Sequence, residues 1–180
     1  MSLVVDASIA IKWVIPEVLS DEADRVRDGE DDVLAPDLLL VEVANALWRK
    51  TSAKEISPRE ASAAFDLVRQ SGIDLRPTGP LVPRAMDVAR RLGHPVYDCV
   101  YLALAEREHA TFITADQRLL RRLSTRRLDI SIVDLRTLRD GSSRRVDTES
   151  RLGVRICTDS QKPGFRRRGI YARSADPSLG

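Results

Sequence analysis

The sequence predicts an α/β/α sandwich around a central, mostly parallel sheet of about five strands. Short runs of large aliphatic residues alternate along the chain with longer segments of helical periodicity. This alternation is typical of α/β folds with a parallel sheet. The first run, at residues 3–5, is continuously aliphatic, as expected of a strand that is buried on both faces.

The expected strands are short, and each of the first four is followed by at least one helical segment. They cover residues 3–5, 33–35, 73–75, 111–114 and 130–133. Between them, helices are expected at residues 9–14, 20–27, 37–50, 57–71, 81–92, 96–108 and 117–123.

Local signals justify the helix boundaries in order along the chain. Pro16 ends the first helix, because proline cannot continue the backbone hydrogen bonding, and acids fill the first turn of the second, where the helix dipole favours them. Pro36 precedes the long apolar third helix. Ser57 and Glu60 form a capping-box pattern with proline between them at the first helical position. The helix at 96–108 has a broad apolar face, so we expect it to pack in the core.

Length and composition indicate one domain followed by a basic tail. The helix–strand pattern spans residues 1–139 and dissolves over residues 140–180. The formal net charge is +2, but residues 141–180 hold nine basic and four acidic residues, so the basic excess lies in the tail. We expect residues 140–180 to be disordered or loosely attached and dispensable for the fold.

The remaining composition limits the class of protein. No apolar run approaches the roughly 20 residues of a membrane span, and no signal peptide pattern precedes the first strand. The two cysteines, Cys99 and Cys157, are too few for a disulfide framework or a cysteine-based zinc site. A cytoplasmic protein without a membrane segment is the expectation.

Four acidic residues stand where the predicted fold would gather them. Asp6 directly follows the first strand, and Asp116 follows the strand at 111–114 by two residues. Because the carboxyl ends of parallel strands meet at one sheet edge, where ligands bind in α/β folds, we expect these two carboxylates to be neighbours. Glu42 lies among apolar residues of the third helix, and Asp98 lies in the first turn of the helix at 96–108.

Each acid also has an ordinary structural explanation. Asp6 and Asp116 have the position and chemistry of helix N-caps. Asp98 suits the positive end of a helix dipole, and an isolated Glu such as Glu42 is usually solvated. Four such acids at one expected sheet edge favour a functional site over four independent explanations.

The motifs around these acids resemble those of PIN-domain proteins, and most of all the VapC-type toxins of bacterial toxin–antitoxin pairs. The motifs lie at residues 4–8, 40–46, 97–105 and 112–116, and the similarity runs from about residue 3 to residue 135. The resemblance implies an endoribonuclease dependent on Mg²⁺ or Mn²⁺. Its catalytic and metal-binding acids would be the four residues already singled out; its supporting polar residues would be Ser8, Asn45 and Thr114.

The chemistry of four carboxylates agrees with that implication. Ionised carboxylates roughly 6 Å apart would repel one another by about 3 kcal/mol per pair at an effective dielectric constant of about 20. Such a cluster has to protonate in part, stay hydrated or hold cations. Oxygen ligands without histidine or cysteine favour Mg²⁺ or Mn²⁺ over zinc, and neither His94 nor His109 has the sequence context of a catalytic base.

Two alternatives stay open at this point. One is a non-catalytic PIN-like module that binds nucleic acid or protein. The other is a different phosphoryl hydrolase, such as a haloacid-dehalogenase-type phosphatase, but that class needs a second acid two residues after the first, where this chain has Ser8.

The resemblance also implies partners. These are an RNA substrate, a cognate antitoxin that presents a basic residue to the acidic site, and a second copy of the chain in a homodimer. The early helices carry more large apolar side chains than one helix face can bury, Trp13 and Trp48 among them. We therefore expect both tryptophans to belong to an exposed surface that binds the antitoxin.

Overall fold

A five-stranded sheet forms the centre of the molecule in the computed structural model, which describes residues 1–124 and 128–138. Every pairing in the sheet is parallel, and the strand order is β3-β2-β1-β4-β5. The strands are β1 (Ser2–Val5), β2 (Asp32–Pro36), β3 (Asp74–Arg76), β4 (Thr111–Thr114) and β5 (Ile132–Asp134). The predicted fold class is confirmed, and the fifth strand begins two residues later than expected.

Helices connect the strands and cover the sheet. They are α1 (Ala7–Ala10), α2 (Ser20–Arg27), α3 (Leu38–Ser52), α4 (Pro58–Arg69), α5 (Val82–Leu92), α6 (Val96–Arg107) and α7 (Gln117–Leu123). Three short 3₁₀ segments accompany them: η1 (Ile11–Trp13), η2 (Gly79–Leu81) and η3 (Leu135–Leu138). The single helix expected at residues 9–14 is in fact α1 followed by η1, because Asp6 caps the chain at once and α1 begins at Ala7. The capping box of α4 forms as predicted, with both Ser57–Glu60 hydrogen bonds present.

The core lies on both faces of the sheet, as the alternation of side chains along β1 requires. Val4 faces a large cluster that includes α3, α5 and α6, whereas Leu3 and Val5 face a smaller cluster that includes α2 and η3. Helix α6 is buried almost all round, with seven consecutive buried residues over 99–105. It therefore fixes the position of the polar side chains that it carries.

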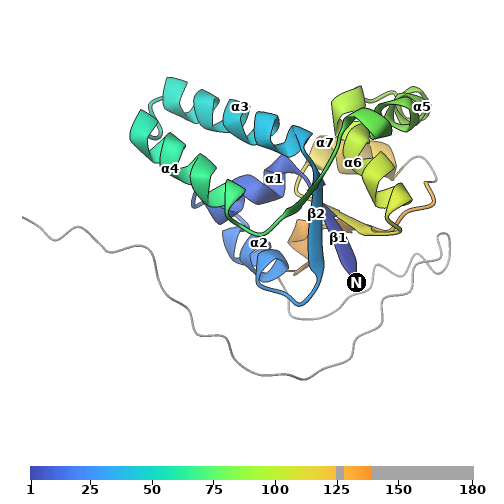
Figure 1. Ribbon diagram of the computed structural model, residues 1–180, viewed down its shortest axis with the longest axis horizontal. Helices are drawn as coiled ribbons and strands as arrows, with labels where there is room; N and C mark the ends of the chain where they lie inside the picture. Colours follow the sequence, from blue (N-terminus) through green and yellow to red (C-terminus); the bar gives the residue numbers. More distant parts are fainter. Residues whose placement is uncertain (125–127, 139–180) are drawn as a thin grey trace, which may run out of the picture.

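The strand order creates a topological switch point next to β1. After β1 the chain builds β2 and β3 on one side, and it then returns to place β4 on the other side. Helices α3 and α4 project together on one side of the carboxyl ends of the strands, and α5 and α6 stand on the other (Figure 1). In open parallel sheets the crevice at such a switch point is the usual place for a ligand.

Two further expectations concern the basic tail and membrane-spanning helices. The basic tail predicted at residues 140–180, with Cys157, lies outside the described residues. Among the helices of the described part of the chain, each falls short of the length and apolarity that crossing a bilayer requires.

Candidate active site

Asp6 lies at the switch point, at the carboxyl end of the middle strand β1. It caps α1 by accepting a hydrogen bond from the backbone N–H of Ile9 (3.2 Å), and it also accepts hydrogen bonds from the hydroxyls of Ser8 and Thr114 (2.5 Å each). The residue is 8% exposed. Burial raises the pKa of Asp6 to about 6, although the three hydrogen bonds oppose the rise, and the nearby carboxylate of Asp116 adds to it.

Asp116 reaches the same edge from the adjacent strand β4. It caps α7, accepting from the backbone N–H groups of Arg118 (2.7 Å) and Leu119 (3.2 Å). Its own N–H donates to the Thr114 hydroxyl (2.9 Å), the same hydroxyl that donates to Asp6. The capping explanation is therefore correct for Asp6 and Asp116, and capping does not keep either carboxylate from lining the shared cleft.

Glu42 points from α3 toward the other acids. Its side chain is half-buried, and the hydroxyl of Tyr101 on α6 donates a hydrogen bond to Oε2. Burial raises the pKa of Glu42 to about 7; the Tyr101 hydrogen bond opposes this rise, and the carboxylates of Asp98 and Asp6 add to it. Glu42 is thus not a solvated surface acid.

Asp98 completes the group from the first turn of α6. Oδ2 of Asp98 lies 2.8 Å from Nε2 of His94, a buried residue in the loop before α6. Burial raises the pKa of Asp98, the His94 ring opposes the rise, and the Asp116 carboxylate contributes to it. The four acids thus surround one space.

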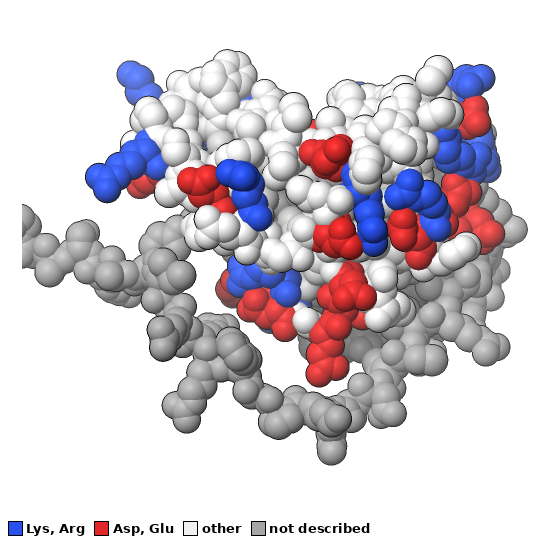
Figure 2. Space-filling view, viewed as in Figure 1, with Lys and Arg blue, Asp and Glu red and all other residues white. Residues whose placement is uncertain are grey.

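That space is a cleft of about 800 Å³. All four acids line it, together with Ser8 and Asn45, whereas Thr114 is fully buried beneath it and acts on Asp6. The molecular surface is hollowed between α3 and the α5–α6 pair, with acidic side chains in the hollow (Figure 2). The structure therefore brings together the four acids and the three supporting polar residues that the sequence singled out.

Sequence reasoning missed two residues of this arrangement. The sequence gives His94 no catalytic context, and it predicts only core packing for the helix at 96–108 that carries Tyr101, so the contacts of both residues with the acids were not expected. The signal for Tyr101 was available, because a tyrosine in the core needs a partner for its hydroxyl. His94 also stands four residues before Asp98, a spacing that brings side chains together at a helix start.

The donor set suits a hard divalent cation. Carboxylate and hydroxyl oxygens are the ligands of Mg²⁺ and Mn²⁺. The pKa values of Asp6 and Glu42 are raised mainly because burial disfavours the charged form, and a bound cation would favour that form again. In the described residues no three carboxylate, imidazole or thiol side chains stand close enough to hold one ion among them. The site thus fits a cation held by one or two carboxylates and completed by water, as is usual for Mg²⁺.

Comparison with known proteins gives concordant results in sequence and structure. The PIN domain family model matches residues 3–124. Ribonuclease VapC3 of Pyrobaculum aerophilum is 31% identical over 121 residues, which are 66% of this chain and 92% of that protein.

Two solved structures share the fold. The crystal structure of PAE2754 from Pyrobaculum aerophilum superposes with a TM-score of 0.58 at 24% identity, covering 77% of this chain and 93% of that one. The structure of VapBC2 from Rickettsia felis, bound to a DNA fragment from their promoter, gives a TM-score of 0.52 at 11% identity, covering 74% and 98%. Because the family model matches about two thirds of its residues, and the parallel sheet carries four acids at its switch point, this chain belongs to the PIN domain family.

Proposed function

We propose that this protein is a metal-dependent endoribonuclease of the VapC type that hydrolyses RNA phosphodiester bonds. The observation that carries the proposal is the convergence of Asp6, Glu42, Asp98 and Asp116 on one cleft. Similarity to a ribonuclease VapC supports the reaction class. A phosphatase of the haloacid-dehalogenase type is disfavoured, because Ser8 donates to Asp6 from the position where that class needs a second acid.

The chain's own residues hold the carboxylates in fixed orientations. Ser8 and Thr114 each bind one oxygen of Asp6, Tyr101 binds Oε2 of Glu42, and the ring of His94 contacts Oδ2 of Asp98. A Mg²⁺ or Mn²⁺ ion held by Asp6, Glu42, Asp98 and Asp116, directly or through water, would lower the pKa of a bound water and offset charge on the attacked phosphate. Fixed carboxylates need no reorganisation during the reaction, which is the main contribution of a preorganised polar site.

Cleavage of a labelled single-stranded RNA tests the proposal. Wild-type protein should cleave with millimolar Mg²⁺ or Mn²⁺ and not with excess chelator, and Asp98→Asn should be inactive. Glu30→Gln is the matched control, because Glu30 is an exposed carboxylate on the loop before β2. RNA binding without cleavage under every metal condition would instead support a non-catalytic PIN-like module.

We also propose that the activity is restrained by an antitoxin that covers α3, and that the protein forms a homodimer. Val41 and Trp48 are 65% and 64% exposed and lie two turns apart on the same face of α3. The expectation that Trp13 also belongs to an exposed surface was wrong. Trp13 is half-buried, packs against both core clusters and donates its indole N–H to the carbonyl of Ala23 (2.7 Å). Its amphipathic ring joins η1 to α2 instead.

The two partners are tested separately. The proposed cognate antitoxin should inhibit RNA cleavage, and Trp48→Ala should weaken that inhibition. An unchanged inhibition constant would place the antitoxin elsewhere. Light scattering at several protein concentrations should give twice the monomer mass, and a monomer at all concentrations would contradict the homodimer.

A further inference from the structure

The cleft that holds the four acids continues past them into a region lined by basic side chains. This basic end is formed by Lys12 of η1 and by Arg49 and Lys50 of α3, with Glu17 and Glu55 beside them. The side chains that line the cleft are therefore acidic around the four acids and mainly basic at the basic end. An anionic polymer would meet like charge at the acids and opposite charge at the basic end.

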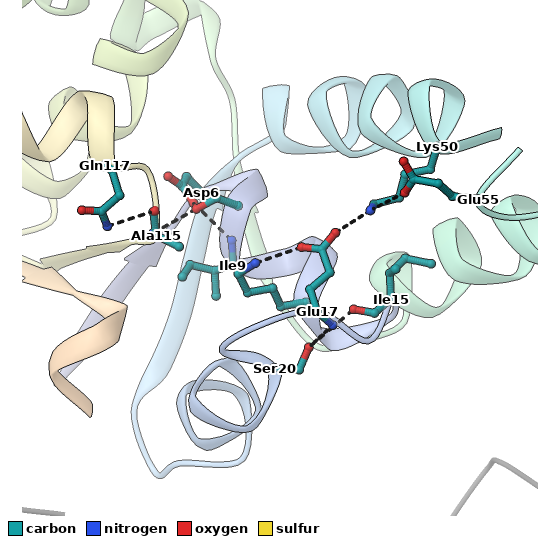
Figure 3. A network of polar contacts seen from close by, with 11 residues as sticks. Asp6, Ile9, Ile15, Glu17, Ser20, Lys50, Glu55, Ala115 and Gln117 are labelled. Carbon is teal, nitrogen blue, oxygen red and sulfur yellow. Dashed lines mark hydrogen bonds and ion pairs between the residues drawn. The ribbon is translucent and has the colours of Figure 1, made fainter. Parts of the chain in front are cut away.

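Glu17 compensates the two lysines of the basic end. Its carboxylate lies 2.9 Å from Nζ of Lys12 and 2.6 Å from Nζ of Lys50, and Lys50 also pairs with Glu55 (3.2 Å). Figure 3 shows Glu17 extending from the loop after η1 toward Lys50 on α3. These ion pairs join the two segments that form this wall of the cleft, so we assign the lysines mainly to its architecture.

Arg49 differs from both lysines. Its side chain is exposed, and within residues 1–124 and 128–138 its guanidinium has no ion pair or hydrogen bond. The other arginine lining the cleft, Arg118, lies near Asp98 and offsets its charge. Arg49 is thus the cation of the cleft that is not already compensated by an acid of the described residues.

The position of Arg49 relative to the acids is fixed by α3. Arg49 follows Asn45 by one helical turn and Glu42 by two, and all three line the cleft. Seven residues of helix rise about 10 Å, roughly one to two nucleotides of an extended strand. A guanidinium binds phosphate through paired N–H groups, whose geometry matches two phosphate oxygens.

We propose that Arg49 binds a backbone phosphate of single-stranded RNA, one to two nucleotides from the phosphate that is cleaved. This inference rests on the proposed ribonuclease function, whose substrate it places in the cleft. The strand runs along α3, with Asn45 facing the nucleotide between the two phosphates. Arg49 thereby sets the register of the RNA against the acids and takes no part in the chemical step.

The first experiment compares Arg49→Gln with Arg59→Gln on one RNA whose cleavage site has been mapped. Arg59 is an exposed arginine on α4 that does not line the cleft, so it controls for the loss of a surface charge. Arg49→Gln should raise KM about fivefold to tenfold and leave kcat unchanged, because a single charge-assisted contact is lost. The slope of log KM against log salt should fall by about 0.7, the value for one phosphate of a single strand.

The second experiment locates the phosphate. Single neutral methylphosphonates are placed at each position flanking the cleavage site of the RNA. On the wild type, one position should raise KM by as much as Arg49→Gln does, and on Arg49→Gln that position should have no further effect. A penalty that persists in full on Arg49→Gln, or equal behaviour of Arg49→Gln and Arg59→Gln, would overturn the assignment.

Equilibrium binding separates this inference from the proposed function. The same oligonucleotides are titrated into Asp6→Asn protein with and without Arg49→Gln, so that no cleavage is required. Suppose that adding Arg49→Gln weakens RNA binding and reduces the salt dependence of the affinity, while the wild type never cleaves RNA. That result would support the Arg49 contact and refute the ribonuclease function. Cleavage by the wild type with no effect of Arg49→Gln on either KM or binding would support the ribonuclease and refute the Arg49 contact.

Discussion

Asp6→Asn should change the stability of the protein in a way that depends on pH. The pKa of Asp6 is 3.8 when the carboxyl is solvated and about 6 in the folded state, because burial disfavours the charged form. Between these values the folded state binds more protons than the unfolded state, so stability falls as pH rises through this window. The ionised carboxylate thus destabilises the fold fully above about pH 6 and not below about pH 4.

The magnitude follows from the two pKa values. The shift corresponds to a penalty of about 3 kcal/mol at about pH 8, of which about half remains at about pH 5. The substitution removes this penalty, but it also disturbs the hydroxyl donors. The hydroxyls of Ser8 and Thr114 each accept a hydrogen bond from a backbone N–H (3.0 and 2.9 Å) and donate to Asp6. In Asp6→Asn one of the two hydroxyls faces the amide nitrogen, which cannot accept its hydrogen, so that hydrogen bond is lost. That loss of about 1 kcal/mol does not depend on pH.

Urea unfolding with excess chelator, at about pH 5 and about pH 8, measures the effect. Relative to the wild type, Asp6→Asn should gain stability toward unfolding on going from the lower pH to the higher pH, by about half of the 3 kcal/mol penalty. Glu30→Gln, which removes an exposed carboxylate, should differ from the wild type by less than about 0.5 kcal/mol at both pH values. A destabilisation by Asp6→Asn that is the same at both pH values would refute the assignment of Asp6 as a buried, charged carboxylate.

Three further predictions concern the groups around the acids. Tyr101→Phe removes the hydrogen bond that lowers the pKa of Glu42, so that pKa should rise and the acidic limb of the kcat/KM profile should move to higher pH. The free energy of unfolding should fall by about 1 kcal/mol. An acidic limb at the same pH would show that ionisation of Glu42 does not control the reaction. His94→Gln removes the ring that contacts Asp98, so kcat should fall while circular dichroism stays native, and full activity would show that His94 is not a positioning residue. Mn²⁺ at about ten times its Kd should stabilise the wild type by about 1.4 kcal/mol, read as a rise in Tm that is smaller for Asp6→Asn; equal rises in the two proteins would locate the ion away from Asp6.

The sequence determined the features that depend on local pattern. Continuous aliphatic runs and helical periodicity identified the strands and helices, because each element records its own burial in the spacing of its apolar residues. The capping box of α4 and the caps at Asp6 and Asp116 could also be predicted from the sequence, because a capping side chain binds backbone groups no more than three residues away. Asp6 and Asp116 could be named because each follows a strand, and strand ends of a parallel sheet share an edge. Glu42 and Asp98 could be named from their places in helices and from the family resemblance.

Only the tertiary structure decided which of these elements became neighbours. It placed β4 next to β1 and so joined Thr114 to Asp6 across 108 residues, and it brought Tyr101 to Glu42 across 59. It also separated the two tryptophans, burying the edge of Trp13 against α2 while leaving Trp48 exposed on α3. The apolar periodicity of a helix shows how much surface it buries and says nothing of the element it is buried against. The partner of each face is set by strand order and by the packing of whole helices, which involve residues distant in the chain.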